Sequence, residues 1–132
     1  NAVRNNLSHC MEMICVSDLF RNVNKSKNND ANDKLFDLIV FDPPYRWFAA
    51  RDILEASITD ENYGMLRRFV REAPDHLRKP GGRVLLSFGT TGDLDYVLTL
   101  FERSGCFDRE PLSSLSKMKN GEKVVYHCWV FH

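Results

Sequence analysis

The sequence lacks the features that would place it in a membrane, in an oxidising compartment or around a metal ion. No apolar run approaches the ~18 residues of a membrane-spanning helix, and no signal peptide is visible. No C-x-x-C pair is present, and no cysteine lies at metal-ligand spacing from a histidine; the cysteines are Cys10, Cys15, Cys106 and Cys128. We therefore interpret the cysteines as free thiols of a cytoplasmic protein, and we predict no metal site and no membrane partner.

The sequence also lacks an excess of charge of either sign. Lysine and arginine together number 18, aspartate and glutamate together number 18, and the formal net charge is zero. This balance gives no basic field over the whole chain that would argue for nucleic-acid binding, but it does not exclude a local basic patch. With 132 residues, 43% of them apolar and 27% charged, the chain has the size and composition of one globular domain.

Apolar periodicity predicts strands that alternate with helices along the chain. The expected strands, including both arms of a terminal hairpin, are 11–17, 35–41, 83–88, 113–118 and 123–131. Residues 1–9 suit the last turns of a helix, and residues 21–34 have the composition of a polar surface loop. The continuous apolar run at 35–41 predicts a strand that is covered on both faces, as in a parallel sheet.

Two helices are expected between these strands. The first is capped by Thr59 or Asp60 and ends before the "KPGG" turn at 79–82; its apolar face comprises Leu66, Phe69, Val70, Ala73 and Leu77. The second begins at Asp93 and ends at Gly105. Asn120-Gly121 is the pair that two-residue hairpin turns prefer. The order of elements predicts the α/β class, with a parallel sheet to which the hairpin adds an antiparallel part.

The stretch "LFDLIVFDPPYRWF", Leu35–Phe48, carries the chemistry. Its apolar strand stops at Asp42-Pro43-Pro44-Tyr45, and ligands of open parallel sheets bind beyond the carboxyl ends of the strands. Because the two prolines have fixed φ and no N–H, the segment is stiff. It can hold a flat group that bears an NH2: the carboxylate accepts one N–H, the Pro43 carbonyl accepts the other, and the Tyr45 ring stacks on the flat face.

Holding an amine in this way suits one kind of reaction. An exocyclic amine is a poor nucleophile because its lone pair is delocalised into the adjoining ring or carbonyl. Two acceptors on its hydrogens shift the nitrogen towards a tetrahedral form whose lone pair is available. Positioning, together with electrostatic stabilisation of the positive charge that develops on the nitrogen, then favours attack.

"DPPY" after "FDLIVF" resembles the fourth motif of the S-adenosylmethionine-dependent methyltransferases that modify planar nitrogens. That motif is Asp, Asn or Ser, then Pro-Pro, then Tyr, Phe or Trp. It occurs in adenine-N6 and cytosine-N4 DNA methyltransferases, in rRNA and tRNA amino-methyltransferases and in release-factor glutamine methyltransferases. Flanking stretches are similar as well: "NAVRNNL", "VSDLF", "LRKPGGRVLLSFG", "LDYVLTLFERSGCF" and the closing hairpin. The resemblance covers nearly all 132 residues.

The resemblance implies a Rossmann-like methyltransferase sheet, mostly parallel with a C-terminal antiparallel hairpin, and S-adenosylmethionine as cofactor. Asp42 would accept the substrate amine, Pro43 would give its carbonyl, Pro44 would stiffen the turn, and Tyr45 would stack on the substrate. Asp18 and Leu19, at the end of the third-strand match, would lie against the adenine of the cofactor; an Asp after a strand is equally an ordinary turn residue. Trp47 or Phe48 would either wall the substrate pocket or begin the packing of the next helix.

The glycine-rich motif of this family, Asp/Glu-x-Gly-x-Gly, is missing from the sequence. It cradles the methionine part of the cofactor, and together with the first two strands it would precede Asn1. We therefore expect residues 1–132 to be the C-terminal part of a methyltransferase catalytic domain whose N-terminal strands are missing. In the family's strand order, 3-2-1-4-5-7-6, the strand at 11–17 would then lack its neighbours. We expect this stretch alone to bind the cofactor weakly or not at all and to be inactive.

Three functions fit these observations. The first is methylation of an exocyclic amine of a nucleobase, with RNA favoured over DNA and the base flipped out of any duplex. The second is methylation of a glutamine side chain of a protein; those enzymes usually carry Asn at the first motif position, where this chain has Asp42. The third is a non-catalytic methyltransferase-like module that binds RNA or a partner chain, which the missing glycine-rich motif favours and the intact Asp-Pro-Pro-Tyr disfavours.

Overall fold

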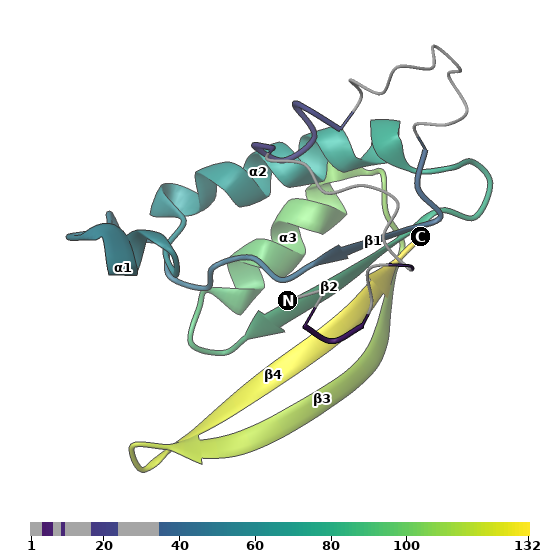
Figure 1. Ribbon diagram of the computed structural model, residues 1–132. Coiled ribbons are helices and arrows are strands. Elements are labelled where there is room, and N and C mark those ends of the chain that lie inside the picture. The colour runs from purple at the N-terminus through teal and green to yellow at the C-terminus, as the bar shows by residue number, and fades with distance from the viewer. Residues whose placement is uncertain (1–3, 7–8, 10–16, 24–34) are drawn as a thin grey trace.

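The computed structural model describes residues 4–6, 9, 17–23 and 35–132 (Figure 1). Its strands are β1 (Leu38–Phe41), β2 (Arg83–Gly89), β3 (Arg109–Lys119) and β4 (Glu122–Phe131). Its helices are α1 (Ile53–Ala56), α2 (Gly64–Glu72) and α3 (Leu94–Ser104), with 3₁₀ turns η3 (Glu61–Tyr63) and η4 (Ala73–His76). The helix expected in residues 1–9, the strand at 11–17 and the loop at 21–34 lie wholly or partly outside the described residues.

The four strands form one mixed sheet in the order β1-β2-β4-β3. β1 runs parallel to β2, and β4 is antiparallel to both β2 and β3. The expected combination of a parallel pair with a C-terminal antiparallel hairpin is therefore confirmed, and the order corresponds to the 4-5-7-6 portion of the expected sheet. The protein belongs to the α/β class.

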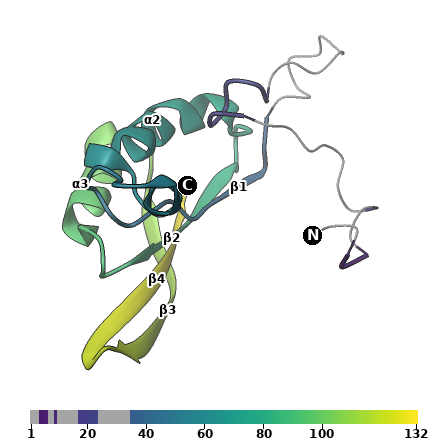
Figure 2. The ribbon, with the colours of Figure 1, turned by 60° about the vertical axis from the view of Figure 1, so that its left-hand side comes forward.

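The closing hairpin is longer than the sequence predicted. β3 begins at Arg109, and the two strands turn at Asn120-Gly121 as expected. Both turn residues have positive φ, 52° and 83°, which is the conformation of a type I′ turn. The hairpin projects well beyond the end of β2 (Figure 2).

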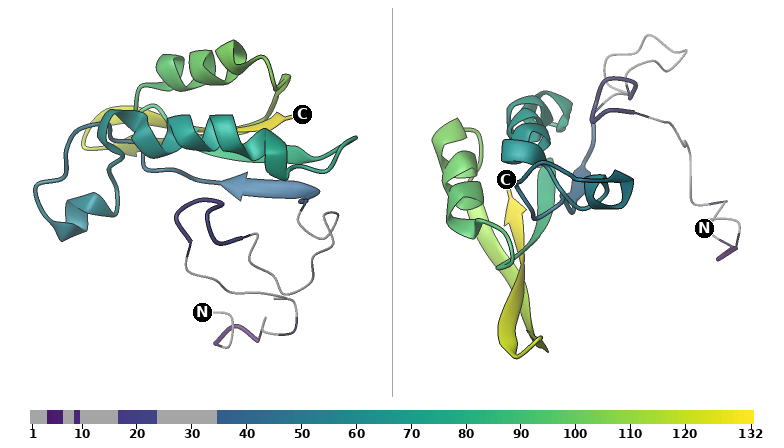
Figure 3. Two further views of the ribbon diagram at one scale, coloured as in Figure 1. Left: turned by 90° about the horizontal axis from the view of Figure 1, so that it is seen from above. Right: turned by 90° about the vertical axis from the view of Figure 1, so that its left-hand side faces the viewer.

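Both long helices pack on the same face of the sheet (Figure 3), and this corrects the expectation for β1. Phe41 stacks on Phe69 of α2 with ring centroids 3.8 Å apart, whereas Leu38 and Val40 on the other face are 48% and 67% exposed. The prediction of a strand covered on both faces is wrong in the described structure. The helices that follow β1 and β2 cover one face only, so the apolar residues of the opposite face meet solvent.

The first long helix follows the predicted pattern but ends earlier. Leu66, Phe69 and Val70 are buried as expected, and the chain then continues as η4 because Pro74 has no N–H to extend the α-helical ladder. Asp60 caps the helix from outside: its carboxylate accepts the N–H groups of Met65 at 2.8 Å and Leu66 at 2.9 Å. The second helix begins and ends as predicted, with Asp93 as N-cap and Gly105 as C-cap.

Candidate functional site

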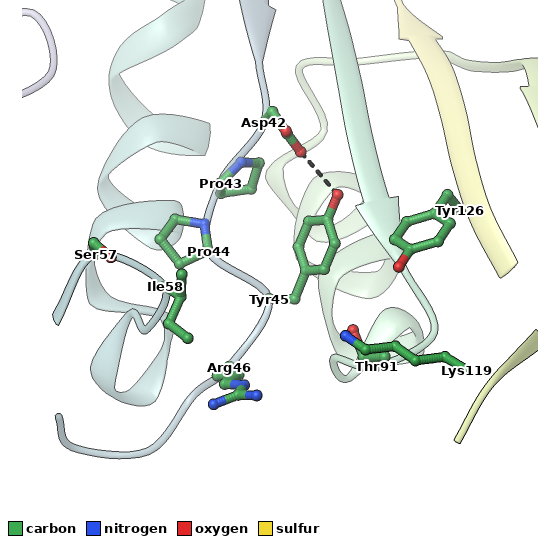
Figure 4. Close-up of a pocket in the computed structure, with 10 residues that line it drawn as sticks. All are labelled: Asp42, Pro43, Pro44, Tyr45, Arg46, Ser57, Ile58, Thr91, Lys119 and Tyr126. Atoms are coloured by element: carbon green, nitrogen blue, oxygen red, sulfur yellow. Dashed lines mark hydrogen bonds between the residues drawn. The ribbon is translucent and has the colours of Figure 1, made fainter. Parts of the chain in front are cut away.

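A cleft of about 420 Å³ opens where Asp42-Pro43-Pro44-Tyr45 leaves β1 (Figure 4). Three parts of the chain line it: the motif with the loop that follows, the turn after β2, and the closing hairpin. The lining residues are Asp42, Pro43, Pro44, Tyr45, Arg46, Ser57, Ile58, Thr91, Lys119 and Tyr126. The four predicted motif residues therefore line one cavity at the carboxyl end of a parallel strand.

Within the cleft, the hydroxyl of Tyr45 donates a hydrogen bond of 2.9 Å to Oδ1 of Asp42 (Figure 4). Burial and the nearby Asp42 carboxylate raise the pKa of Tyr45 above its usual 10.0, so its hydroxyl keeps the proton that it donates. Oδ2 of Asp42 has no hydrogen-bond partner among the described residues and is available to a ligand.

The Tyr45 ring packs against aromatic neighbours from both strands beside it. Its centroid lies 4.8 Å from Phe88 of β2 and 6.3 Å from Tyr126 of β4, at interplanar angles of 53° and 48°. These contacts hold the ring on the β2 side of the cleft. A flat ligand would therefore be bounded by tilted aromatic rings on that side.

Tyr63 anchors the motif through its hydroxyl group, a role that the sequence did not predict. Its side chain is 4% exposed, and its hydroxyl donates to the Tyr45 carbonyl at 2.9 Å while accepting the N–H of Asp93 at 2.8 Å. Burial raises its pKa above 10.0. Asn62 and Tyr63 both have left-handed backbone angles, so the chain turns sharply just before α2. This turn brings the Tyr63 side chain to the Tyr45 carbonyl.

Two backbone hydrogen bonds extend the anchoring beyond the motif. The carbonyl of Arg46 accepts the N–H of Asp60 at 2.7 Å, and that of Trp47 accepts the N–H of Asn62 at 2.7 Å. Together with Tyr63, these bonds tie the loop after Tyr45 to the start of α2. The segment is thus stiffened by these hydrogen bonds as well as by its two prolines.

We predict that Tyr63→Phe lowers the free energy of unfolding by about 1–3 kcal/mol, because the part-buried carbonyl of Tyr45 and N–H of Asp93 lose their partner together. Urea denaturation measures the change. Tyr96→Phe is the matched control, since the Tyr96 ring stacks on Tyr63 but its hydroxyl has no hydrogen bond in the described structure. Equal effects of the two substitutions would contradict the anchoring role.

Two glycines let the neighbouring backbone approach Tyr45. A Cβ on Gly92 would lie 2.4 Å from the Tyr45 carbonyl oxygen and 2.7 Å from the Phe88 ring. A Cβ on Gly89 would lie 3.0 Å from the Tyr45 ring and 3.1 Å from that of Tyr126. The "GTTG" turn therefore supports the motif by close packing.

The predicted cofactor residues lie apart from this cleft. Leu19 lines a separate apolar groove of about 270 Å³; its other lining residues are Phe20, Val23, Phe36, Leu38, Ile39, Phe41 and Phe69. Both carboxylate oxygens of Asp18 accept bonds from the Arg68 guanidinium, at 3.1 and 2.9 Å. The side-chain hydrogen bonds to Asp18 are the main reason why the pKa of the Arg68 guanidinium is raised. Asp18 is thus an ion-pair partner of α2.

Trp47 and Phe48, whose role the sequence left open, do not line the cleft. Trp47 is 48% exposed and its ring lies 6.3 Å from that of Tyr63. Phe48 is 42% exposed beneath the guanidinium of Arg46, 5.8 Å from its ring centroid. The hairpin supplies lining residues in their place: Tyr126, which pairs with Gly89 of β2, and Lys119, which the pairing of β3 with β4 places there.

Among the described residues, no group of three or more His, Cys, Asp or Glu side chains is arranged to hold a metal ion. In the same part of the chain, no helix has the length and apolar character needed to cross a membrane.

Comparison with known proteins gives little beyond this geometry. No protein-family model matches the chain, and no curated protein matches it. One solved structure that resembles it is the N-methyltransferase NodS from Bradyrhizobium japonicum WM9, with 16% sequence identity and a TM-score of 0.38. The match covers 74% of this chain and 52% of that one, so this chain spans about half its length. A likeness so distant carries no argument about function, which rests on the site itself.

Proposed function

We propose that the chain is the C-terminal part of the catalytic domain of an S-adenosylmethionine-dependent N-methyltransferase that acts on an exocyclic amine of a nucleobase, in RNA rather than DNA. The observation that carries the proposal is the placement of Asp42 and Tyr45 at the mouth of a cleft, at the carboxyl end of β1. The strand order supports it, because it is the order that the motif's resemblance implies.

The two carboxylate oxygens of Asp42 have different hydrogen-bond partners. Oδ1 holds the Tyr45 hydroxyl, so Oδ2 is left to accept one N–H of a substrate amine. The Pro43 carbonyl accepts no backbone hydrogen bond from the described residues, and it is the second acceptor. Two acceptors on the amine hydrogens make the nitrogen lone pair available and stabilise the positive charge that develops during attack. The aromatic wall of Tyr45 and Tyr126 orients the flat base.

The residues present fit the cofactor in part. S-adenosylmethionine would supply an electrophilic methyl group. The groove beside Leu19 is apolar and large enough for the face of an adenine ring, and we propose Leu19 as a contact there. Asp18 would hold the adenine amino group only while sharing its carboxylate with Arg68.

Transfer of a labelled methyl group tests the proposed function. The full-length protein is incubated with methyl-labelled cofactor and with purified RNA, DNA and protein in separate reactions. We expect label in RNA that RNase releases, and we expect Asp42→Ala to slow its incorporation about 10²- to 10³-fold. Label in protein alone would support glutamine methylation instead, and label in none of the three would support a non-catalytic binding module.

A further inference from the structure

Two cations line the cleft without an acidic partner. Arg46 and Lys119 form no ion pair with any described residue, although other arginines of the chain do so; one of these is Arg51, which pairs with Glu55 of α1. Both cations lie toward the end of the cleft away from Asp42 (Figure 4). The cleft is therefore polarised, with a carboxylate at one end and two positive charges at the other.

The register of the hairpin fixes the position of Lys119. Leu115 pairs with Tyr126 and Lys119 with Glu122, and because side chains alternate along a strand, Lys119 lies on the same face as Tyr126. Lys123 pairs with Met118 and lies on the opposite face. Glu122 is directly across from Lys119 but makes no ion pair with it. The charge of Lys119 is thus presented to the cleft.

Arg46 is held in place but not neutralised. Its carbonyl is fixed by the N–H of Asp60, and its guanidinium lies over the Phe48 ring. The pKa of Glu55 falls to about 2; hydrogen bonds from Arg51 are the main cause, and the charge of Arg46 contributes least. Glu55 is therefore already committed to Arg51, and the guanidinium of Arg46 remains available to an anion.

We propose that Arg46 and Lys119 bind backbone phosphates of a single-stranded nucleic acid on either side of the base that enters the cleft. The inference rests on the proposed function for the identity of that base. Both side chains can donate charge-assisted hydrogen bonds to phosphate oxygens. Proteins that bind single strands typically combine positive charges, which contact the backbone, with aromatic rings such as Tyr45 and Tyr126, on which bases stack. A single strand is favoured because its bases reach Asp42 at the mouth of the cleft without the cost of leaving a duplex.

Fluorescence anisotropy with a labelled 12-nucleotide single-stranded RNA of mixed sequence tests the proposal without any methyl transfer. Arg46→Gln and Lys119→Gln are each expected to weaken binding about 3- to 10-fold, and the pair to weaken it further. Each should lower the slope of log affinity against log salt by about 0.7, the value for one phosphate contact on a single strand. Lys123→Gln, on the other face of the same hairpin, should leave affinity within twofold.

Three results would overturn the phosphate sites. They are unchanged affinity and salt slope in the double variant, an effect of Lys123→Gln as large as that of Lys119→Gln, and tighter binding of a labelled acidic peptide than of the RNA. Asp42→Ala separates this inference from the proposed function, since it should lower methyl transfer while RNA binding keeps its dependence on Arg46 and Lys119. RNA binding that depends on Arg46 and Lys119 in a protein that methylates nothing would support the phosphate sites and reject the proposed function.

Discussion

Replacing Asp42 by alanine is expected to lower the kcat of methyl transfer by the full-length protein about 10²- to 10³-fold. The carboxylate is the acceptor that we assign to the substrate amine, and its loss removes stabilisation that grows as positive charge develops on the nitrogen. The side chain is exposed, and the only hydrogen bond it receives in the described structure comes from Tyr45. The free energy of unfolding should therefore change little, which urea denaturation checks.

Two further substitutions separate the parts of this effect. Asp42→Asn keeps one oxygen acceptor without the negative charge, so its kcat should lie between those of the wild type and Asp42→Ala. Tyr45→Phe removes the hydroxyl that occupies Oδ1 but keeps the ring, and we expect a smaller loss than for Asp42→Ala. Wild-type activity in Asp42→Ala with the fold intact would contradict the assignment of Asp42 as the amine acceptor.

Features set by a few adjacent residues could be predicted from the sequence. Asp93 caps α3, Gly105 ends it with a left-handed backbone, and Asn120-Gly121 turns the hairpin, each as expected. In these cases the deciding interaction is a side chain on its own backbone, or the steric freedom of one residue. The position of Asp42 after a strand was equally readable, because a strand that runs into two prolines must end there.

Features that depend on distant pairing could not be read in this way. The exposure of Val40 depends on which face of the sheet α2 and α3 cover, and the apolar run at 35–41 is the same whether one face or both are covered. Tyr63 reaches Tyr45 only through a left-handed turn between α1 and α2. Lys119 enters the cleft because of the hairpin register, which no local pattern in "KMKNGEK" relates to Asp42.

Gly92→Ala is expected to damage the site more than any other small substitution around it. The new methyl group would lie 2.4 Å from the backbone oxygen of Tyr45, and a backbone atom cannot move aside as a flexible side chain can. We expect a loss of about 1–3 kcal/mol in the free energy of unfolding, as for other overpacked sites. The surviving folded protein should have Tyr45 displaced, and a shift of about 1 Å in a reacting geometry costs ~10²-fold in rate.

Gly64→Ala is the matched control for this prediction. Gly64 has an ordinary helical φ of −63°, and the nearest atom to an added Cβ is an Asp60 oxygen at 3.8 Å. Because alanine restricts the unfolded chain, this variant should be more stable by about 0.4–1 kcal/mol and fully active. If Gly92→Ala were as stable and as active as Gly64→Ala, the turn after β2 would not hold Tyr45 in place. The rigidity of the segment would then rest on its two prolines, on Tyr63 and on the backbone hydrogen bonds of Arg46 and Trp47.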